Sequence, residues 1–322
     1  MPRITIDMVH PELRSKAKSI DKPMQAFSLT KTRILKALCQ LLRRRHSPQM
    51  NYRQEYIIRP DGSRLRICVY TPHQRRENVL GLLWIHGGGY VIGVPEQDDA
   101  YILRFIEASG CVVVAPDYTL APDKPYPAAL DDCYLSLLWL RDHGIEYGMR
   151  PDQIFVGGNS AGGGLAAAVS LYARDKSEVA IAFQMLLYPM LDDRATVSST
   201  NNNAPVWNSN DNDGAWRLYL GDSYRSEGVP IYAAPGRTVD YSALPPTLSF
   251  VGNIEPFYDE TVIFIDNLKK NGIPVQFKVF DGCFHAFDRM CAKTEIAKQA
   301  VVFLMENFAH AVENYFAPQN LP

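Results

Sequence analysis

The feature that most constrains the fold of this chain is an alternation of short apolar runs with longer segments of helical period. These apolar runs have the character of strands buried on both faces. These runs cover residues 79–85, 111–115, 154–156, 183–188, 247–251 and 275–280. Segments of helical period separate or follow them, at residues 98–108, 128–143, 161–174, 258–271 and 296–315. The alternation predicts βαβ units and a mostly parallel central sheet flanked by helices.

Two regions precede that pattern. Residues 54–59 and 65–71 predict a hairpin around the turn Pro60-Asp61-Gly62-Ser63. The first fifty residues have helical character. An apolar stripe at helical spacing is formed by Ile34, Leu35, Leu38, Leu41 and Leu42. We expect this helix to pack on the main body with its basic face in water; a helix on a membrane surface is the alternative.

One stretch, residues 191–243, interrupts the alternation of strands and helices. It is long, rich in Asn, Asp, Ser and Pro, and contains Trp207 and Trp216. Loops of this length inside a compact domain are usually functional and often serve as lids. We expect short helices within it, for example at residues 214–220.

The length and the net charge limit the number of domains and the kinds of partner. The 322 residues suffice for one large α/β domain or two ordinary ones, and the net charge of −2 indicates no nucleic-acid or anionic-membrane partner. The N-terminus has no signal-peptide core, and the early apolar stretch is too short for stable membrane insertion. The default expectation is a cytoplasmic protein.

The strongest chemical signal is the sequence G-x-S-x-G at residues 158–162, directly after an apolar run and before a helical segment. This context is typical of a nucleophile elbow, in which Ser160 occupies a sharp strand-to-helix turn. A phosphate-binding loop would require a Lys after its last glycine, and the chain has none there. A dinucleotide-binding loop would place its acidic residue after a second strand, and the acidic residues at this spacing follow a helix.

A second glycine-rich sequence, His86-Gly87-Gly88-Gly89, also follows an apolar run. Successive glycines leave backbone N–H groups open to a substrate oxygen. Together with the N–H group of Ala161, they can stabilise the oxyanion of a tetrahedral intermediate.

A serine nucleophile needs a base and an acid. Only His285 and His310 follow the elbow; His285 comes just after an apolar run, whereas His310 falls inside the last helical segment. The acid is expected between the serine and the histidine in the chain, at the end of a strand. Glu255 has this position and Asp259 is the nearby alternative. The distant alternatives are Asp192 and Asp193.

Together these motifs resemble the hormone-sensitive-lipase-like family of α/β-hydrolases, which includes bacterial acetyl esterases. The motifs that carry the resemblance are His86-Gly87-Gly88-Gly89-Tyr90, Asp117-Tyr118-Thr119-Leu120-Ala121-Pro122, Pro127-Ala128-Ala129, Gly158-Asn159-Ser160-Ala161-Gly162-Gly163 and Leu187-Tyr188-Pro189. The resemblance implies an α/β-hydrolase fold with an eight-stranded sheet. Its helical cap would comprise residues 1–49 and an insertion at 192–241, around a catalytic core of residues 50–191 and 242–322.

The resemblance also implies site residues. Ser160 would be the nucleophile, His285 the base and Glu255 the acid. The oxyanion hole would be formed by Gly87, Gly88 and Ala161. The acid position holds Glu where the family usually has Asp, and Asn159 stands before the serine where the family usually shows Asp.

The resulting hypothesis is a serine carboxylesterase that hydrolyses short-acyl-chain esters through an acyl-enzyme, with no cofactor and no metal. The candidate substrate-pocket residues are Tyr90, Trp207 and Trp216. The same apparatus serves amidases, deacetylases and lactonases, which the sequence does not separate from esterases. A non-enzymatic ligand-binding protein is a further alternative, because the plant gibberellin receptor resembles this family but lacks the triad histidine. The expected partner is a small-molecule ester, and many relatives form dimers, which allows a homodimer here.

Overall fold

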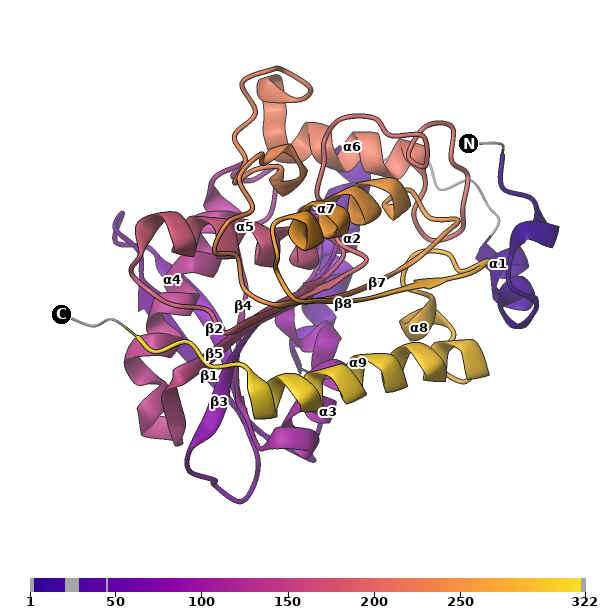
Figure 1. Ribbon diagram of the computed structural model, residues 1–322. Helices are drawn as coiled ribbons and strands as arrows, with labels where there is room; N and C mark the ends of the chain where they lie inside the picture. Colours follow the sequence, from indigo (N-terminus) through magenta and orange to yellow (C-terminus); the bar gives the residue numbers. More distant parts are fainter. Residues whose placement is uncertain (1–2, 21–28, 45, 320–322) are drawn as a thin grey trace.

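The computed structural model describes residues 3–20, 29–44 and 46–319. Its centre is an eight-stranded sheet with the spatial order β1-β2-β4-β3-β5-β6-β7-β8 (Figure 1). Strand β2 is antiparallel to both of its neighbours, and all the other pairs are parallel. The strands are β1 Asn51–Ile58, β2 Arg64–Thr71, β3 Val79–Ile85, β4 Val112–Pro116, β5 Met149–Asn159, β6 Phe183–Leu187, β7 Thr247–Gly252 and β8 Val275–Phe280.

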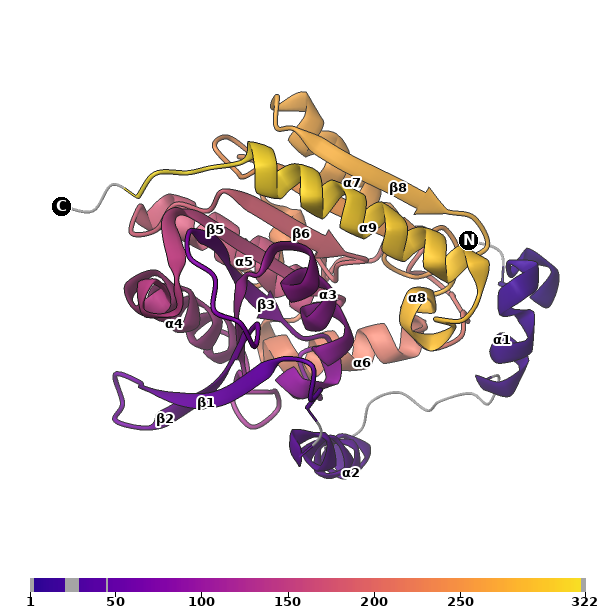
Figure 2. The same ribbon diagram turned by 90° about the horizontal axis from the view of Figure 1, so that it is seen from below.

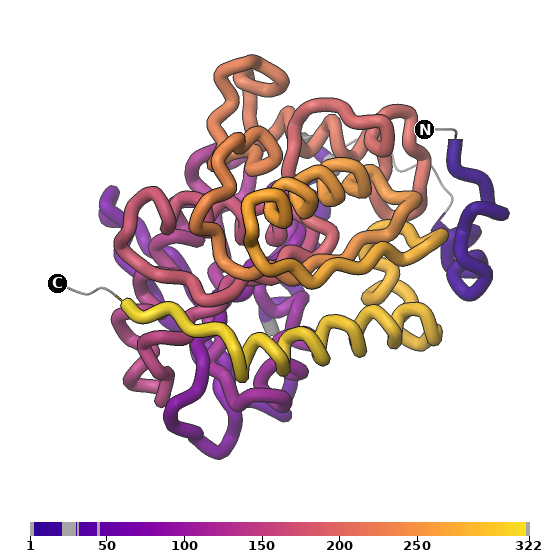
Figure 3. Tube along the Cα trace, in the orientation of Figure 1, coloured from indigo at the N-terminus to yellow at the C-terminus, as the bar shows by residue number. Residues whose placement is uncertain are grey.

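Helices cover both faces of the sheet. The α-helices are α1 Arg14–Ile20, α2 Leu29–Gln40, α3 Asp99–Ser109, α4 Ala128–His143, α5 Ala161–Lys176, α6 Ser209–Leu220, α7 Tyr258–Lys270, α8 Phe287–Met290 and α9 Glu295–Asn314. Helices α3, α8 and α9 lie on one face, which Figure 2 shows from below. Helices α4, α5 and α7 lie on the other, and α6 lies above them in the view of Figure 1, which the tube in Figure 3 repeats. Within the described ranges, no helix combines the length and the apolar character needed to cross a membrane.

Two apolar cores fill the space between the layers, one on each face of the sheet. Successive residues of a strand point to opposite faces. In β5, for example, Ile154 and Val156 belong to the core beneath α4 and α5, and Phe155 belongs to the core beneath α3 and α9. The central strands are therefore apolar throughout, which is why the sequence pattern identified them. The mostly parallel sheet expected from that pattern is confirmed, and so is the eight-stranded α/β-hydrolase fold that the family resemblance implied.

The expectation for the N-terminal helix was wrong in one respect. The apolar stripe is mostly exposed, with Ile34 at 58%, Leu38 at 54% and Leu41 at 66% of their full accessibility, although Leu35 packs against the core. Two ion pairs join this segment to the body, one from Lys36 of α2 and one from Arg43 in the 3₁₀ turn Leu41–Arg44. Lys36 lies 2.5 Å from Asp123.

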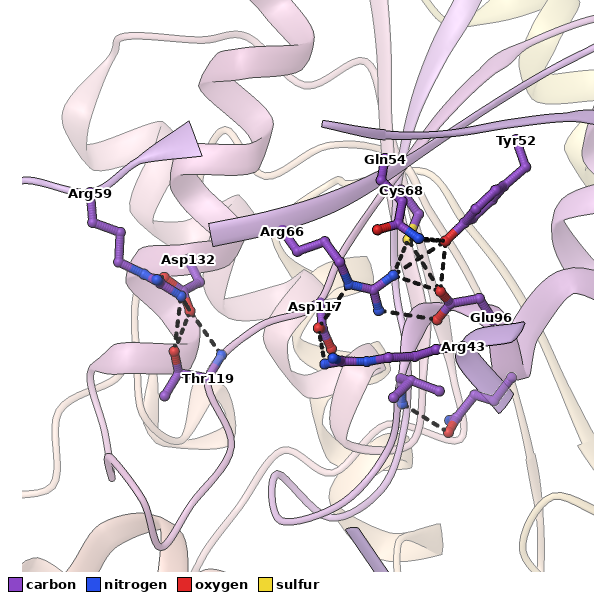
Figure 4. Close-up of polar contacts among 12 residues, drawn as sticks. Arg43, Tyr52, Gln54, Arg59, Arg66, Cys68, Glu96, Asp117, Thr119 and Asp132 are labelled. Atoms are coloured by element: carbon purple, nitrogen blue, oxygen red, sulfur yellow. Dashed lines mark hydrogen bonds and ion pairs between the residues drawn. The ribbon is translucent and has the colours of Figure 1, made fainter. Parts of the chain in front are cut away.

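The second of these ion pairs joins a charged network beneath the sheet edge (Figure 4). Arg43 from the N-terminal segment contacts Asp117, which also pairs with Arg66 at 3.0 Å. Arg66 reaches Glu96 at 2.6 Å. Because Arg66 and Glu96 are buried and paired, their charges are compensated, and the network connects the N-terminal segment to the loop that precedes α3.

Candidate active site

Ser160 lies in a tight turn between β5 and α5. Its backbone has φ 57° and ψ −125°, which is unfavourable for a residue with a side chain and is typical of strain kept at functional sites. The flanking glycines permit the turn: a Cβ on Gly162 would lie 2.0 Å from the carbonyl oxygen of Ile85, and one on Gly158 would lie 2.4 Å from that of Gly162. The strand and the helix can therefore approach closely only with glycine at these positions.

Three side chains from three loops meet at this turn. His285 Nε2 lies 2.9 Å from Ser160 Oγ, and His285 Nδ1 is in hydrogen-bond contact with Glu255 Oε2. The second oxygen, Oε1, accepts a hydrogen bond of 3.0 Å from the backbone N–H of Gly252. All three side chains are buried. With the proton of the neutral imidazole on Nδ1, Nε2 is free to accept the serine proton.

The other carboxylates considered from the sequence have partners elsewhere. Asp259 Oδ2 accepts a hydrogen bond of 2.6 Å from the N–H of Ser198. Asp192 pairs with Arg194 and Asp193 with Arg237, at 2.7 and 2.6 Å. The structure thus brings Glu255, and not these residues, to the imidazole.

The glycine loop after β3 lies directly against the serine. A Cβ on Gly87 would come within 3.1 Å of Ser160 Cβ and 2.4 Å of Asn159 Oδ1. The carbonyl oxygen of Gly87 accepts hydrogen bonds from Gln97 Nε2 at 3.0 Å and from His86 Nδ1 at 2.9 Å. In a trans peptide the N–H points opposite to the C=O, so these two bonds also fix the direction of the Gly88 N–H.

A further donor comes from helix α5. The N–H of Ala161 belongs to the first turn of the helix, where N–H groups have no partner within the helix and carry the positive end of its dipole. A negatively charged oxygen placed above Ser160 would face this end of the helix.

Tyr118 supports the glycine loop, a role that sequence reasoning missed. Its hydroxyl donates a hydrogen bond of 2.9 Å to the carbonyl of His86, and the two rings stack with centroids 4.3 Å apart. Burial lowers the pKa of His86 below its ordinary value, which favours the neutral ring. The signal was the Asp117-Tyr118 motif, for which the sequence alone suggested no chemical role.

The three aromatic residues expected to line the substrate pocket, Tyr90, Trp207 and Trp216, lie in different surroundings. The ring of Trp207 lies 6.2 Å from that of His285, and a Cβ on Gly89 would be 2.5 Å from its Cη2 atom. Trp216 packs against Tyr90, with ring centroids 5.3 Å apart, and the Tyr90 hydroxyl donates to the carbonyl of Met190. Of the three, Trp207 is therefore the one placed against both the glycine loop and the imidazole.

The backbone just before Trp207 is strained. Val206 has φ 72°, a conformation that is a genuine outlier for a β-branched residue. Such strain costs of order 1–3 kcal/mol and persists only where the surroundings require it. Val206 directly precedes Trp207, so this strain lies beside the proposed site.

Among the residues that the structure describes, no group of three or more His, Cys, Asp or Glu side chains is placed to hold a metal ion.

Comparison with known proteins places this geometry in a family. Residues 82–289, about two thirds of the chain, match the α/β hydrolase fold family. Esterase LipI of Mycobacterium tuberculosis is 32% identical over 67% of this chain and 68% of its own length. Carboxylesterase NlhH of the same organism is 31% identical over 77% of this chain and 79% of its own length. Among solved structures, a bacterial heroin esterase aligns with a TM-score of 0.87 and 33% identity, covering 96% of this chain and 99% of that one. The chain therefore belongs to the α/β-hydrolase fold family, in the hormone-sensitive-lipase-like group whose motifs its sequence carries.

Proposed function

We propose that this protein is a serine carboxylesterase that hydrolyses esters of short acyl chains through an acyl-enzyme on Ser160. The observation that carries the proposal is the contact of His285 with both partners, Nε2 at 2.9 Å from Ser160 Oγ and Nδ1 against Glu255. That arrangement is the geometry by which a hydroxyl is activated as a nucleophile.

In the acylation step, Ser160 Oγ attacks the ester carbonyl carbon while His285 Nε2 takes its proton. The carbonyl oxygen becomes negatively charged as the tetrahedral intermediate forms. When the intermediate collapses, the bond to the alcohol oxygen breaks, and the proton on Nε2 passes to that oxygen. Glu255 holds the Nδ1–H throughout and stabilises the imidazolium.

In the deacylation step, water takes the place of the alcohol. Nε2 removes a proton from the water, whose oxygen attacks the acyl carbon, and the same proton then returns to Ser160 Oγ as the acid leaves. The Glu255 carboxylate remains ionised in both steps.

The proposed oxyanion hole consists of the backbone N–H groups of Gly87, Gly88 and Ala161. The fixed Gly87 carbonyl and the N-terminus of α5 support this assignment, because donors held before the reaction need no reorganisation as charge develops. Each such donor contributes about 10²–10³ in rate.

We propose that a cap covers the site and that Trp207 limits the acyl group. The cap would comprise residues 1–49 and 192–241, with the catalytic core at 50–191 and 242–322. The indole ring lies against Gly89 and His285, so it would block a long acyl substituent on that side. Trp216 and Tyr90 would instead hold the cap together.

The esterase assignment agrees with the relatives, which are named as esterases and carboxylesterases. The test is hydrolysis of p-nitrophenyl esters with acyl chains of increasing length, together with a matched anilide and a lactone. We expect kcat/KM to be highest for short acyl chains and the anilide to be far slower than the ester. Faster turnover of the anilide or the lactone, or no turnover of any ester, would contradict the proposal.

A further inference from the structure

Arg289 connects the segment that carries His285 with the turn at Ser160 and with the glycine loop after β3. It lies on the short helix α8, four residues after His285. Its Nη1 lies 2.9 Å from Asp98 Oδ1 and 3.3 Å from Asn159 Oδ1, and its Nη2 donates to the carbonyl of Gln97 at 2.9 Å. The chemistry assigned above to Ser160 and His285 uses none of these contacts.

The first branch leads to the nucleophile. The side chain of Asp98 is fully buried, and Arg289 is the only cation paired with it in the described part of the chain. Asp98 Oδ2 accepts hydrogen bonds from Trp84 Nε1 at 2.9 Å and from Asn159 Nδ2 at 2.5 Å. Because Asn159 immediately precedes Ser160, the guanidinium and the carboxylate together fix the residue on which the strained turn begins.

This geometry also accounts for Asn at position 159. The amide donates to Asp98 through Nδ2 and accepts from Arg289 through Oδ1, so both ends are satisfied. A carboxylate here would place two acidic oxygens about 2.5 Å apart in a buried position, where like charges repel strongly.

The second branch leads to the glycine loop. Arg289 holds the backbone carbonyl of Gln97, and the Gln97 side chain donates to the carbonyl of Gly87. The direction of the Gly88 N–H depends on that carbonyl, so the guanidinium acts on the proposed oxyanion hole through one intermediate residue.

We propose that Arg289 is a positioning residue that aligns the base loop, the nucleophile turn and the oxyanion loop with one another. The inference rests on the proposed function of the same site. It needs the planar fork of a guanidinium, because two different nitrogens serve the two branches, and the ammonium of Lys cannot reproduce this.

The competing explanation is that Arg289 only neutralises the buried Asp98. Both explanations predict that Arg289→Met loses stability, since it leaves an unpaired buried carboxylate. They differ for the double variant Asp98→Asn with Arg289→Met, which removes the buried Asp98 carboxylate together with the cation paired with it. They also differ for Arg289→Lys, which keeps the charge and loses the fork.

The experiment measures kcat, KM, the rate of labelling by an organophosphate and the melting temperature for these variants of the full chain. Arg217→Met, which removes an arginine from an exposed ion pair on α6, is the matched control and should behave as wild type. A misplacement of about 1 Å in a catalytic constellation costs about 10²-fold in rate. We therefore expect Arg289→Met to lose about 10²-fold in kcat and in labelling rate, with KM nearly unchanged.

The decisive results come from the other two variants. We expect the double variant to regain melting temperature but not kcat, and Arg289→Lys to melt near wild type while remaining at least about tenfold slower. Wild-type kcat in either variant would overturn the inference and leave only a charge-balancing role. Failure of the proposed function is distinguishable, because the wild-type protein itself would then show neither ester turnover nor labelling.

Discussion

Replacement of Glu255 by Gln tests the acid assignment through the tautomer of His285. Glu255 offers one oxygen to the N–H of Gly252 and the other to His285 Nδ1. Gln has only one oxygen. If that oxygen keeps the bond to Gly252, the amide NH₂ faces Nδ1, which must then accept a hydrogen bond. The imidazole proton then moves to Nε2 and points at Ser160 Oγ, so Nε2 can no longer accept the serine proton.

The opposite orientation of the amide is also unfavourable. It would return an acceptor to Nδ1 but set its NH₂ against the buried N–H of Gly252, which leaves two donors facing each other. An acid-to-amide change that forces the wrong tautomer costs about 10⁴ in kcat in a serine hydrolase triad. We expect a loss of that order for Glu255→Gln, with little change in melting temperature because the two side chains have the same shape.

The assay is steady-state hydrolysis of p-nitrophenyl acetate, with thermal unfolding measured in parallel. Glu255→Asp keeps the charge on a shorter side chain and should lose at most about 10²-fold. Asp259→Asn is the matched control and should be nearly silent in kcat, because that carboxylate binds the backbone of Ser198. The reasoning is refuted if Asp259→Asn is the slower variant, or if Glu255→Gln retains more than about one tenth of the wild-type kcat.

Three further predictions follow from the same structure. Trp207→Ala should move the optimum of the acyl-chain series to longer chains, whereas Trp216→Ala should lower the melting temperature and leave the optimum in place; the reverse pattern in a p-nitrophenyl ester series would contradict the placement of the two rings. Gly87→Ala puts a methyl group within 2.4 Å of the Asn159 side chain and should lower kcat by about 10²–10³ with a folded protein by circular dichroism. Burial raises the pKa of Asp99 from 3.8 to about 6. Between these two pH values the folded state therefore binds more protons than the unfolded state. The folded state consequently loses stability as the pH rises through this range. Asp99→Asn should therefore gain stability at pH 8, by at most about 3 kcal/mol, and gain almost none near pH 4; an equal gain at both pH values in urea unfolding would count against the shift.

The sequence predicted the parts of the fold that depend on local pattern. Strand β3 has the expected limits because it is an apolar run bounded by turn residues. Strand β8 also has the expected limits, but the expectation that it is buried on both faces was wrong: it is an edge strand, and Gln276 and Val279 are exposed. Strand β5 is longer than expected, since its start at Met149 pairs with Val79 through the backbone and shows no apolar run. The packing of α2 was misjudged because the helical spacing of its leucines does not reveal the long-range contacts of this segment, such as the ion pairs of Lys36 with Asp123 and of Arg43 with Asp117.

The residues of the candidate site were likewise predictable only where they belong to contiguous motifs. The elbow and the glycine loop are contiguous motifs, so their residues could be named from the sequence. Glu255 could be named only with alternatives, because it lies only four residues before Asp259 and spacing alone does not tell which carboxylate points toward the histidine. The contacts of Arg289 join residues 97, 98, 159 and 289, which the chain brings together only in the folded protein. No local pattern could have indicated them.

Covalent labelling tests whether Ser160 is the nucleophile. The wild-type protein is treated with a fluorophosphonate, digested and analysed by mass spectrometry, and Ser160→Ala is treated in parallel. We predict one label per chain, on Ser160, and loss of ester hydrolysis in step with labelling. The folded Ser160→Ala variant should show neither label nor turnover. A label on another residue accompanied by the loss of activity, or wild-type turnover by Ser160→Ala, would contradict it.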